Sequence, residues 1–317
     1  MLCASEKSQG KPFYPISDFY KQKFGEKVFK IPVALAGRCP NMKDGSGLKT
    51  CIFCDEWGSF AYPQNQKNSL IEQIKTHQKV VKKRYNSNKF FVYFQAYTTT
   101  YTQAKAVRDA FSTALSFEDV VGIVIGTRPD CLSPVLLETF NWVSEQSFMA
   151  VELGVQSFDE KQLQWMRRGH TAQKSIEAIQ RLKLECPNVN LGIHLIFGWP
   201  DETVADVIRA AKLCNELGVD NVKLHNLHVL KNTDLEKNFH AGEFTPIEID
   251  DYSHLVSVFL AHLSPHIAIH RLAATASRWE ELVSPAWTRH KMKSFQYVVD
   301  YMNQNQVTQG MNFASSL

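Results

Sequence analysis

The sequence predicts an α/β protein with a parallel sheet, and three observations support that prediction. Short apolar runs alternate with amphipathic stretches, as in successive βα units. The runs are apolar on both faces, which suits strands covered by helices. With 317 residues, of which 44% are hydrophobic, the chain can bury a large core. We therefore expect a doubly wound sheet or a complete or partial barrel.

Six strands are expected in chain order. They are residues 29–37, 90–96, 120–127, 148–156, 189–197 and 221–230. Helical periodicity is clearest in the connections at residues 69–85, 133–146, 171–186 and 203–218. The last of these ends at Gly218, a residue type that commonly stops a helix. Strands and helices therefore alternate through the first two thirds of the chain.

The alternation fails from about Thr233. A polar linker there leads to an apolar helix over residues 250–263, a strand-like stretch over residues 266–274 and a final helix. Three parts of the chain are therefore expected: a lead-in of residues 1–28, a core of residues 29–232, and an extension of residues 233–317 that packs on the core.

Composition and charge argue against several classes of protein. The formal net charge is +3 and the pI is near 8.4, so there is no strong electrostatic case for a nucleic acid or a membrane surface as partner. The N-terminus lacks the apolar segment of a signal peptide, and no stretch approaches the roughly 20 apolar residues of a membrane helix. An odd number of cysteines, seven, argues against a disulfide framework. We expect a cytoplasmic protein with reduced thiols and no membrane partner.

Three of the cysteines lie close together in the loop after the first strand. They are Cys39, Cys51 and Cys54, the last two in a C-x-x-C spacing. Ligands of parallel α/β folds bind at the carboxyl ends of the strands, where this loop lies. A structural zinc site would need a fourth ligand, such as His77 or a distant histidine. A [4Fe-4S] cluster held by three thiolates, with its fourth iron open to a ligand, fits the pattern better than zinc or buried thiols.

Several motifs add to the cysteine spacing. Phe53 precedes the last cysteine, and the chain contains GTRPDCL at 126–132, VELGVQS at 151–157, RRGHT at 167–171 and FGWPDET at 197–203. With these motifs, residues 25–232 resemble the radical S-adenosylmethionine (SAM) superfamily. The pattern is similar to a bacterial subgroup related to the Elongator catalytic subunit and to the core of oxygen-independent coproporphyrinogen oxidase. The resemblance implies a partial (β/α)6 TIM-like barrel with the C-terminal extension as an α+β unit.

The resemblance also implies cofactors and site residues. A [4Fe-4S] cluster on Cys39, Cys51 and Cys54 would cleave SAM to a 5′-deoxyadenosyl radical that acts on a substrate. Gln156 and Arg168 match positions that contact SAM in the relatives, and Glu152 matches the Elongator-like pattern. The relatives' glycine-rich segment beside the SAM amine is replaced by QAYTTTY at 95–101, where the backbone carbonyls of Gln95 and Ala96 would serve. Gly126 and His194 stand where relatives carry carboxylates, so those contacts do not transfer.

The substrate side is predicted from the last core strand. Period-two alternation places Lys223 and His225 on one face, and Asn226 and His228 on the other. Polar side chains are unusual in a parallel strand, and they either bond loop carbonyls at the barrel rim or face a cavity. Our hypothesis is that Lys223 and His225 contact the substrate, with Arg271 approaching from the extension.

Partners follow from the same chemistry. We expect SAM, a one-electron donor such as flavodoxin or ferredoxin, and a substrate that is a small molecule or tRNA. The alternative function is an iron-sulfur electron carrier or a zinc-binding scaffold without radical chemistry. A carrier would have no need of a SAM pocket, and the motifs of the fourth and fifth strands therefore favour the enzyme.

Overall fold

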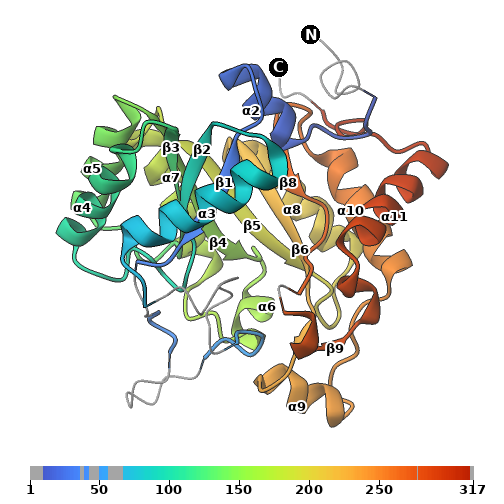
Figure 1. The fold of residues 1–317 in the computed structure, drawn as a ribbon. Helices are drawn as coiled ribbons and strands as arrows, with labels where there is room; N and C mark the ends of the chain where they lie inside the picture. Colours follow the sequence, from blue (N-terminus) through green and yellow to red (C-terminus); the bar gives the residue numbers. More distant parts are fainter. Residues whose placement is uncertain (1–9, 36–38, 43–49, 56–66, 277, 315–317) are drawn as a thin grey trace.

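The protein folds as a sheet of parallel strands wrapped by helices (Figure 1). The computed structural model describes residues 10–35, 39–42, 50–55, 67–276 and 278–314. Within them the sheet has seven strands in the order β1-β2-β3-β4-β5-β6-β8, all parallel. Their bounds are β1 Phe29–Val33, β2 Phe90–Phe94, β3 Val120–Thr127, β4 Phe148–Gln156, β5 Asn190–Phe197, β6 Asn221–Asn226 and β8 Ala268–Arg271. The sheet curls into a partial barrel, as expected.

The six expected strands are confirmed, two of them, β3 and β4, from end to end. The first ends at Val33 rather than at residue 37, and residues 36–38 lie outside the described part of the chain. The strand expected over residues 221–230 is divided: β6 ends at Asn226 and β7 covers Val229–Leu230. It is divided because β7 leaves the main sheet and pairs with β9, Leu282–Ser284, in a small antiparallel ribbon.

The extension contributes a strand to the main sheet. The strand-like stretch at residues 266–274 contains β8, which pairs in parallel with β6. The main sheet therefore has seven strands, one more than the six strands expected for the core. The outer edge of β8 meets the lead-in through a bridge between Pro15 and Ile269. The division of the chain at residues 28 and 232 stays a prediction.

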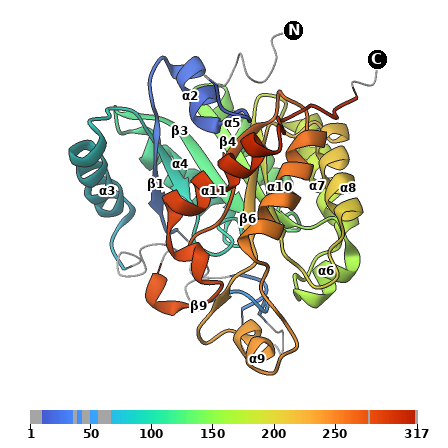
Figure 2. The same ribbon diagram turned by 90° about the vertical axis from the view of Figure 1, so that its right-hand side faces the viewer.

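Helices cover the outer face of the sheet (Figures 1 and 2). Their bounds are α3 Leu70–Tyr85, α4 Ala104–Leu115, α5 Pro134–Ser144, α6 Glu160–Trp165, α7 Ala172–Glu185 and α8 Val204–Glu216. The extension adds α9 Asp234–His240, α10 Ile249–His262 and α11 Lys291–Gln304. Figure 2 shows α10 beside α11, and α10 also packs on α8. The extension thus continues the outer layer.

Capping side chains fix where several helices begin. Ser69 accepts a hydrogen bond from the backbone of Glu72, whose carboxylate bonds the Ser69 backbone, so α3 starts with a complete capping box. Thr203 and Asp206 do the same for α8. Each N-cap contributes about 1 kcal/mol to the stability of its helix.

The two ends of the barrel differ in chemistry. Helix α2, Ile16–Phe24, lies at the end opposite the cysteine loop (Figure 1). Its Tyr20 ring lies 4.9 Å from Phe91 and 6.0 Å from Phe148, so aromatic side chains fill this end. The inward-facing residues closer to the cysteines are polar, and they line a cavity.

Among the described residues, the structure contains no helix whose length and hydrophobicity would let it cross a membrane.

Candidate functional site

A cavity of about 420 Å³ opens at the carboxyl ends of the strands. Nearly all the predicted site residues line it: Cys39, Cys51, Phe53, Cys54, Gln95, Glu152, Gln156, Arg168, Lys223, His225 and Arg271. Ala96 is the exception, because its side chain is fully buried and outside the lining. A volume of this size suits a cofactor or small-molecule site.

Polar neighbours hold the sulfur atoms of the cysteine loop. The hydroxyl of Thr98 donates to Cys39 Sγ at 3.2 Å, and Asn41 Nδ2 lies 3.3 Å from Cys51 Sγ. The Asn41 amide also donates to the backbone carbonyls of Arg167 and Arg168, each at 2.9 Å. The first part of the loop is thereby tied to the segment that follows β4. Sequence reasoning missed Asn41, because its role depends on a contact across more than 120 residues.

The donor set fits a metal cluster. Burial raises the pKa of the Cys54 thiol well above its usual value, and the charges of Cys51, Asp55 and Cys39 raise it further. Three thiolates that crowd in this way need positive charge, which iron supplies. Among the described residues, no three His, Cys, Asp or Glu side chains are placed to hold a single metal ion. His77, considered as a zinc ligand, is buried on α3 and is not part of the cavity wall.

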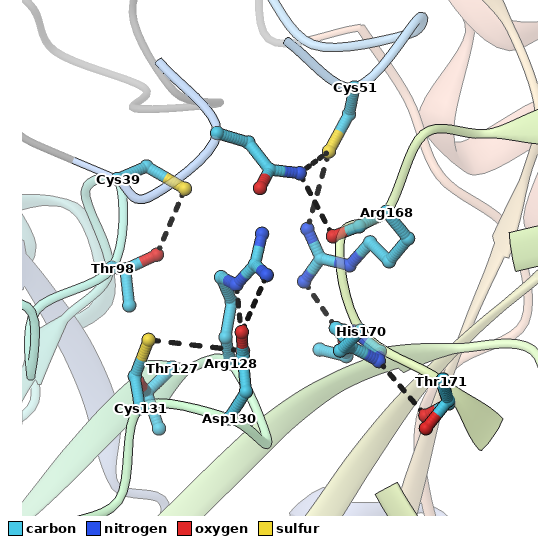
Figure 3. Close-up of polar contacts among 12 residues, drawn as sticks. Cys39, Cys51, Thr98, Thr127, Arg128, Asp130, Cys131, Arg168, His170 and Thr171 are labelled. Atoms are coloured by element: carbon cyan, nitrogen blue, oxygen red, sulfur yellow. Dashed lines mark hydrogen bonds and ion pairs between the residues drawn. The ribbon is translucent and has the colours of Figure 1, made fainter. Parts of the chain in front are cut away.

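Two arginines project to the same place. Figure 3 shows the guanidinium groups of Arg128 and Arg168 beside the sulfur atoms of Cys39 and Cys51. Arg128 makes a bidentate pair with Asp130, with N to O distances of 2.9 and 2.8 Å. Within the described chain, its Nη1 is buried and has no hydrogen-bond partner. Arg128 was not predicted individually, although it lies in the GTRPDCL motif directly after β3.

Arg168 is buried, which rules out a solvated arginine at a helix end. Its Nη2 donates to the carbonyl of Gly154 at 2.9 Å, and its Nη1 lies 3.6 Å from Cys51 Sγ. Nε is buried without a hydrogen-bond partner among the described residues. Buried N–H groups left unpaired cost free energy, so this arginine and Arg128 together are suited to bind an anionic ligand group.

Gln156 owes its position to an irregular strand end. The β4–β5 register shifts between Leu153 and Gln156, and Gln156 has a φ of 72°. This left-handed conformation is rare outside glycine and turns the side chain into the cavity. Glycine at position 154 provides the space that these side chains need, because a Cβ there would lie 2.6 Å from Arg168 Nη2 and 2.8 Å from Gln156 Nε2.

A buried polar cluster lies below these groups. Its centre is Glu152, whose Oε2 accepts hydrogen bonds from Tyr93 at 2.7 Å and pairs with His194 at 2.8 Å and Lys223 at 3.2 Å. Its Oε1 pairs with Lys30, and His270 lies 3.7 Å away. We call these six residues the Glu152 cluster. Side chains from five strands thus offset the cost of burying a carboxylate in the middle of a strand. Of these partners, only Lys223 was predicted from the sequence as a site residue.

The charges within the Glu152 cluster follow from burial and neighbours. Burial acts to raise the pKa of Glu152, but Lys223 and Lys30 hold it well below its usual value. Burial and Lys223 lower the pKa of His194 to about 4, and burial with Lys30 holds that of His270 well below normal. At neutral pH the carboxylate is therefore ionised and both imidazoles are neutral.

Both faces of the β6 region line the cavity. Lys223 and His225 face it as expected, but the expectation that Asn226 and His228 point away is wrong, since both also line it. For His228 the reason is that β6 ends at Asn226, so the period of two does not extend to it. Asn226 lines the cavity from the last position of the strand. Arg271 reaches the cavity from β8, with Nη2 at 2.5 Å from His225 Nδ1.

Comparisons with known proteins identify the family. The signature described as the Radical SAM superfamily matches residues 38–214, and that of the Radical_SAM C-terminal domain matches residues 219–304. The chain belongs to the radical SAM superfamily. It is therefore a radical SAM enzyme, and membership implies an iron-sulfur cluster and SAM.

Known proteins resemble the chain over most of its length. Protein MJ0486 of Methanocaldococcus jannaschii is 34% identical over 96% of this chain and 94% of its own. Protein YhcC of Escherichia coli is 31% identical over 90% of this chain and 91% of its own. Archaeal Elp3 from Methanocaldococcus infernus superposes with a TM-score of 0.64 at 18% identity, over 89% of this chain and 64% of the Elp3 chain. That likeness supports the partial-barrel fold.

Proposed function

We propose that Cys39, Cys51 and Cys54 hold a [4Fe-4S] cluster and that the enzyme cleaves SAM reductively to generate a 5′-deoxyadenosyl radical. The observation that carries the proposal is the meeting of three cysteines and two incompletely paired arginines at the mouth of one cavity. When bound, the cluster supplies the electron for SAM cleavage through its open iron. A flavodoxin or ferredoxin would supply that electron.

The chain's own residues bind and orient SAM. Arg168 would donate to the SAM carboxylate through its free Nε, and Arg128 through its free Nη1. Gln156 would bond SAM from the end of β4, and the backbone at Gln95 and Ala96 would face its amine. Phe53 and the aromatic end of the barrel keep water from the cavity. A radical formed there would meet a substrate placed above the Glu152 cluster.

Reduction with dithionite tests the proposal. The anaerobically prepared protein should release 5′-deoxyadenosine and methionine from SAM, slowly, even without substrate, and chromatography with mass spectrometry would measure both products. An iron-loaded protein that leaves SAM intact would act as an electron carrier instead. Stoichiometric zinc without iron would indicate a scaffold.

Arg168→Ala and Gln156→Ala should each weaken SAM binding by about 1–3 kcal/mol, because each removes a hydrogen bond to the ligand. Equilibrium binding to the cluster-loaded protein would measure the affinity. Arg167→Ala is the matched control, since that guanidinium pairs with Asp234 at 2.6 Å and is outside the cavity lining. Unchanged affinity in both cavity variants would show that the assignment is wrong at these positions.

Gly154→Ala should reduce SAM affinity without a large loss of stability. The new methyl group would displace the tips of Arg168 and Gln156, which are the ends of flexible side chains rather than backbone. We expect a loss of about 1–2 kcal/mol in binding, comparable to one lost hydrogen bond. Thermal unfolding should stay close to wild type. Wild-type SAM affinity in this variant would argue that neither side chain contacts SAM.

A further inference from the structure

Arg271 places a partly buried guanidinium in the cavity wall, where none of the described residues gives it an acidic partner. Its Nε donates to the carbonyl of Leu224 at 3.3 Å, and its Nη2 lies 2.5 Å from Nδ1 of His225. Across the parts of the chain that the structure describes, no carboxylate lies within ion-pair distance of it, and its Nη1 makes no hydrogen bond. An unpaired charge out of bulk water is costly, so such a group normally has a partner.

The surroundings of Arg271 contain too little negative charge. Lys30 and Lys223 already share the single carboxylate of Glu152. Three cations therefore face one anion in the deep part of the barrel. The other acids of the cavity wall, Asp55 and Glu281, both pair with Arg278.

The histidines do not correct this imbalance. Burial and the charge of Arg271 hold the pKa of His225 well below its usual value, so the ring is neutral and accepts from Arg271. His194 and His270 are neutral for the reasons given above. Burial also lowers the pKa of Lys223, to about 8, as expected where the charged form lacks sufficient anionic neighbours.

We propose that the substrate carries an oxyanion, a carboxylate or phosphate group, that binds between Arg271 and Lys223. Both residues line the cavity. This inference rests on the proposed function, because it assigns the substrate class of the same cavity. The SAM carboxylate is not the occupant, since Arg128 and Arg168 at the cysteine loop would bind it.

The donors left over match an oxyanion. Two directions of the Lys223 ammonium are used, toward Tyr93 at 3.1 Å and Glu152 at 3.2 Å, which leaves one N–H. Arg271 offers the two N–H groups of Nη1, and the bond to His225 fixes the plane of the guanidinium. Together they provide three donors and two charges.

Binding of small oxyanions tests the proposal. Malonate and inorganic phosphate would be titrated calorimetrically into the cluster-loaded, SAM-saturated protein at constant ionic strength. We expect binding that weakens at least tenfold in Arg271→Gln and in Lys223→Gln and is partly retained in Arg271→Lys. Arg209→Gln, at an exposed ion pair on α8, is the matched control and should bind as wild type does.

The outcomes distinguish a carboxylate from a phosphate as the bound group, and they test the oxyanion site separately from the proposed SAM cleavage. Tighter malonate binding assigns a carboxylate, and tighter phosphate binding assigns a phosphate. No binding of either, or equal binding in folded Arg271→Gln and Lys223→Gln, overturns the inference. Suppose that the wild-type protein makes no 5′-deoxyadenosine but binds the anion, and that the two variants do not bind it. That result would overturn the proposed function and leave the oxyanion site standing.

Discussion

Alanine at Cys39, Cys51 or Cys54 is expected to abolish cluster binding. Anaerobically prepared wild-type protein should contain about four irons per chain and lose them in air, because a cluster with three thiolate ligands has one labile iron. Each substitution leaves only two thiolates at the mouth of the cavity, too few to retain the cluster. Iron analysis and the visible absorption spectrum would measure the loss, and formation of 5′-deoxyadenosine should cease with it.

Cys131→Ala is the matched control for these variants. Cys131 is not part of the cavity wall, and its Sγ lies 3.8 Å from Oδ1 of Asp130. Its replacement should leave the iron content unchanged. Cys186 and Cys214 are buried in the core, where alanine would create a small cavity without touching the site. A full cluster in all three loop variants would contradict the assignment of the ligands.

Local sequence patterns were sufficient for most of the fold. The strands β3 and β4 were predicted from end to end because continuous apolar runs bounded by turn residues leave few alternatives. The seventh strand, β8, is four residues long and follows two helices, so only its pairing with β6 shows that it belongs to the sheet. Such long-range pairing has no local signal.

The same distinction holds for the site. The cysteines, Arg168 and Gln156 were found because their motifs lie within short segments. The sequence did not single out Lys30, Tyr93 and His270. Each of them has no distinctive local pattern in its own strand and acquires a role only through its contact with Glu152 on β4. An inward-facing carboxylate in a parallel strand was the available signal, since it requires cationic partners from other strands.

Glu152→Gln should destabilise the fold by about 2–4 kcal/mol at neutral pH, because it leaves Lys30 and Lys223 as partly buried charges without their counterion. Chemical denaturation at several pH values would measure the free energy of unfolding. Glu185→Gln is the matched control: Glu185 pairs with Arg181 on the surface of α7, and its loss should cost less than about 1 kcal/mol. A cost that small in Glu152→Gln would contradict the proposed role of the Glu152 cluster.

The pH dependence and a double variant make the test specific. The pKa of Glu152 is lowered in the fold, so its contribution is present above the unfolded value of about 4.3 and is lost as pH falls through the folded value. The difference between wild type and Glu152→Gln should therefore shrink at pH values below about 4. Adding Lys30→Met to Glu152→Gln removes one of the stranded cations and should recover part of the stability. A double variant less stable than Glu152→Gln would mean that Lys30 stabilises the fold through contacts other than its pair with Glu152.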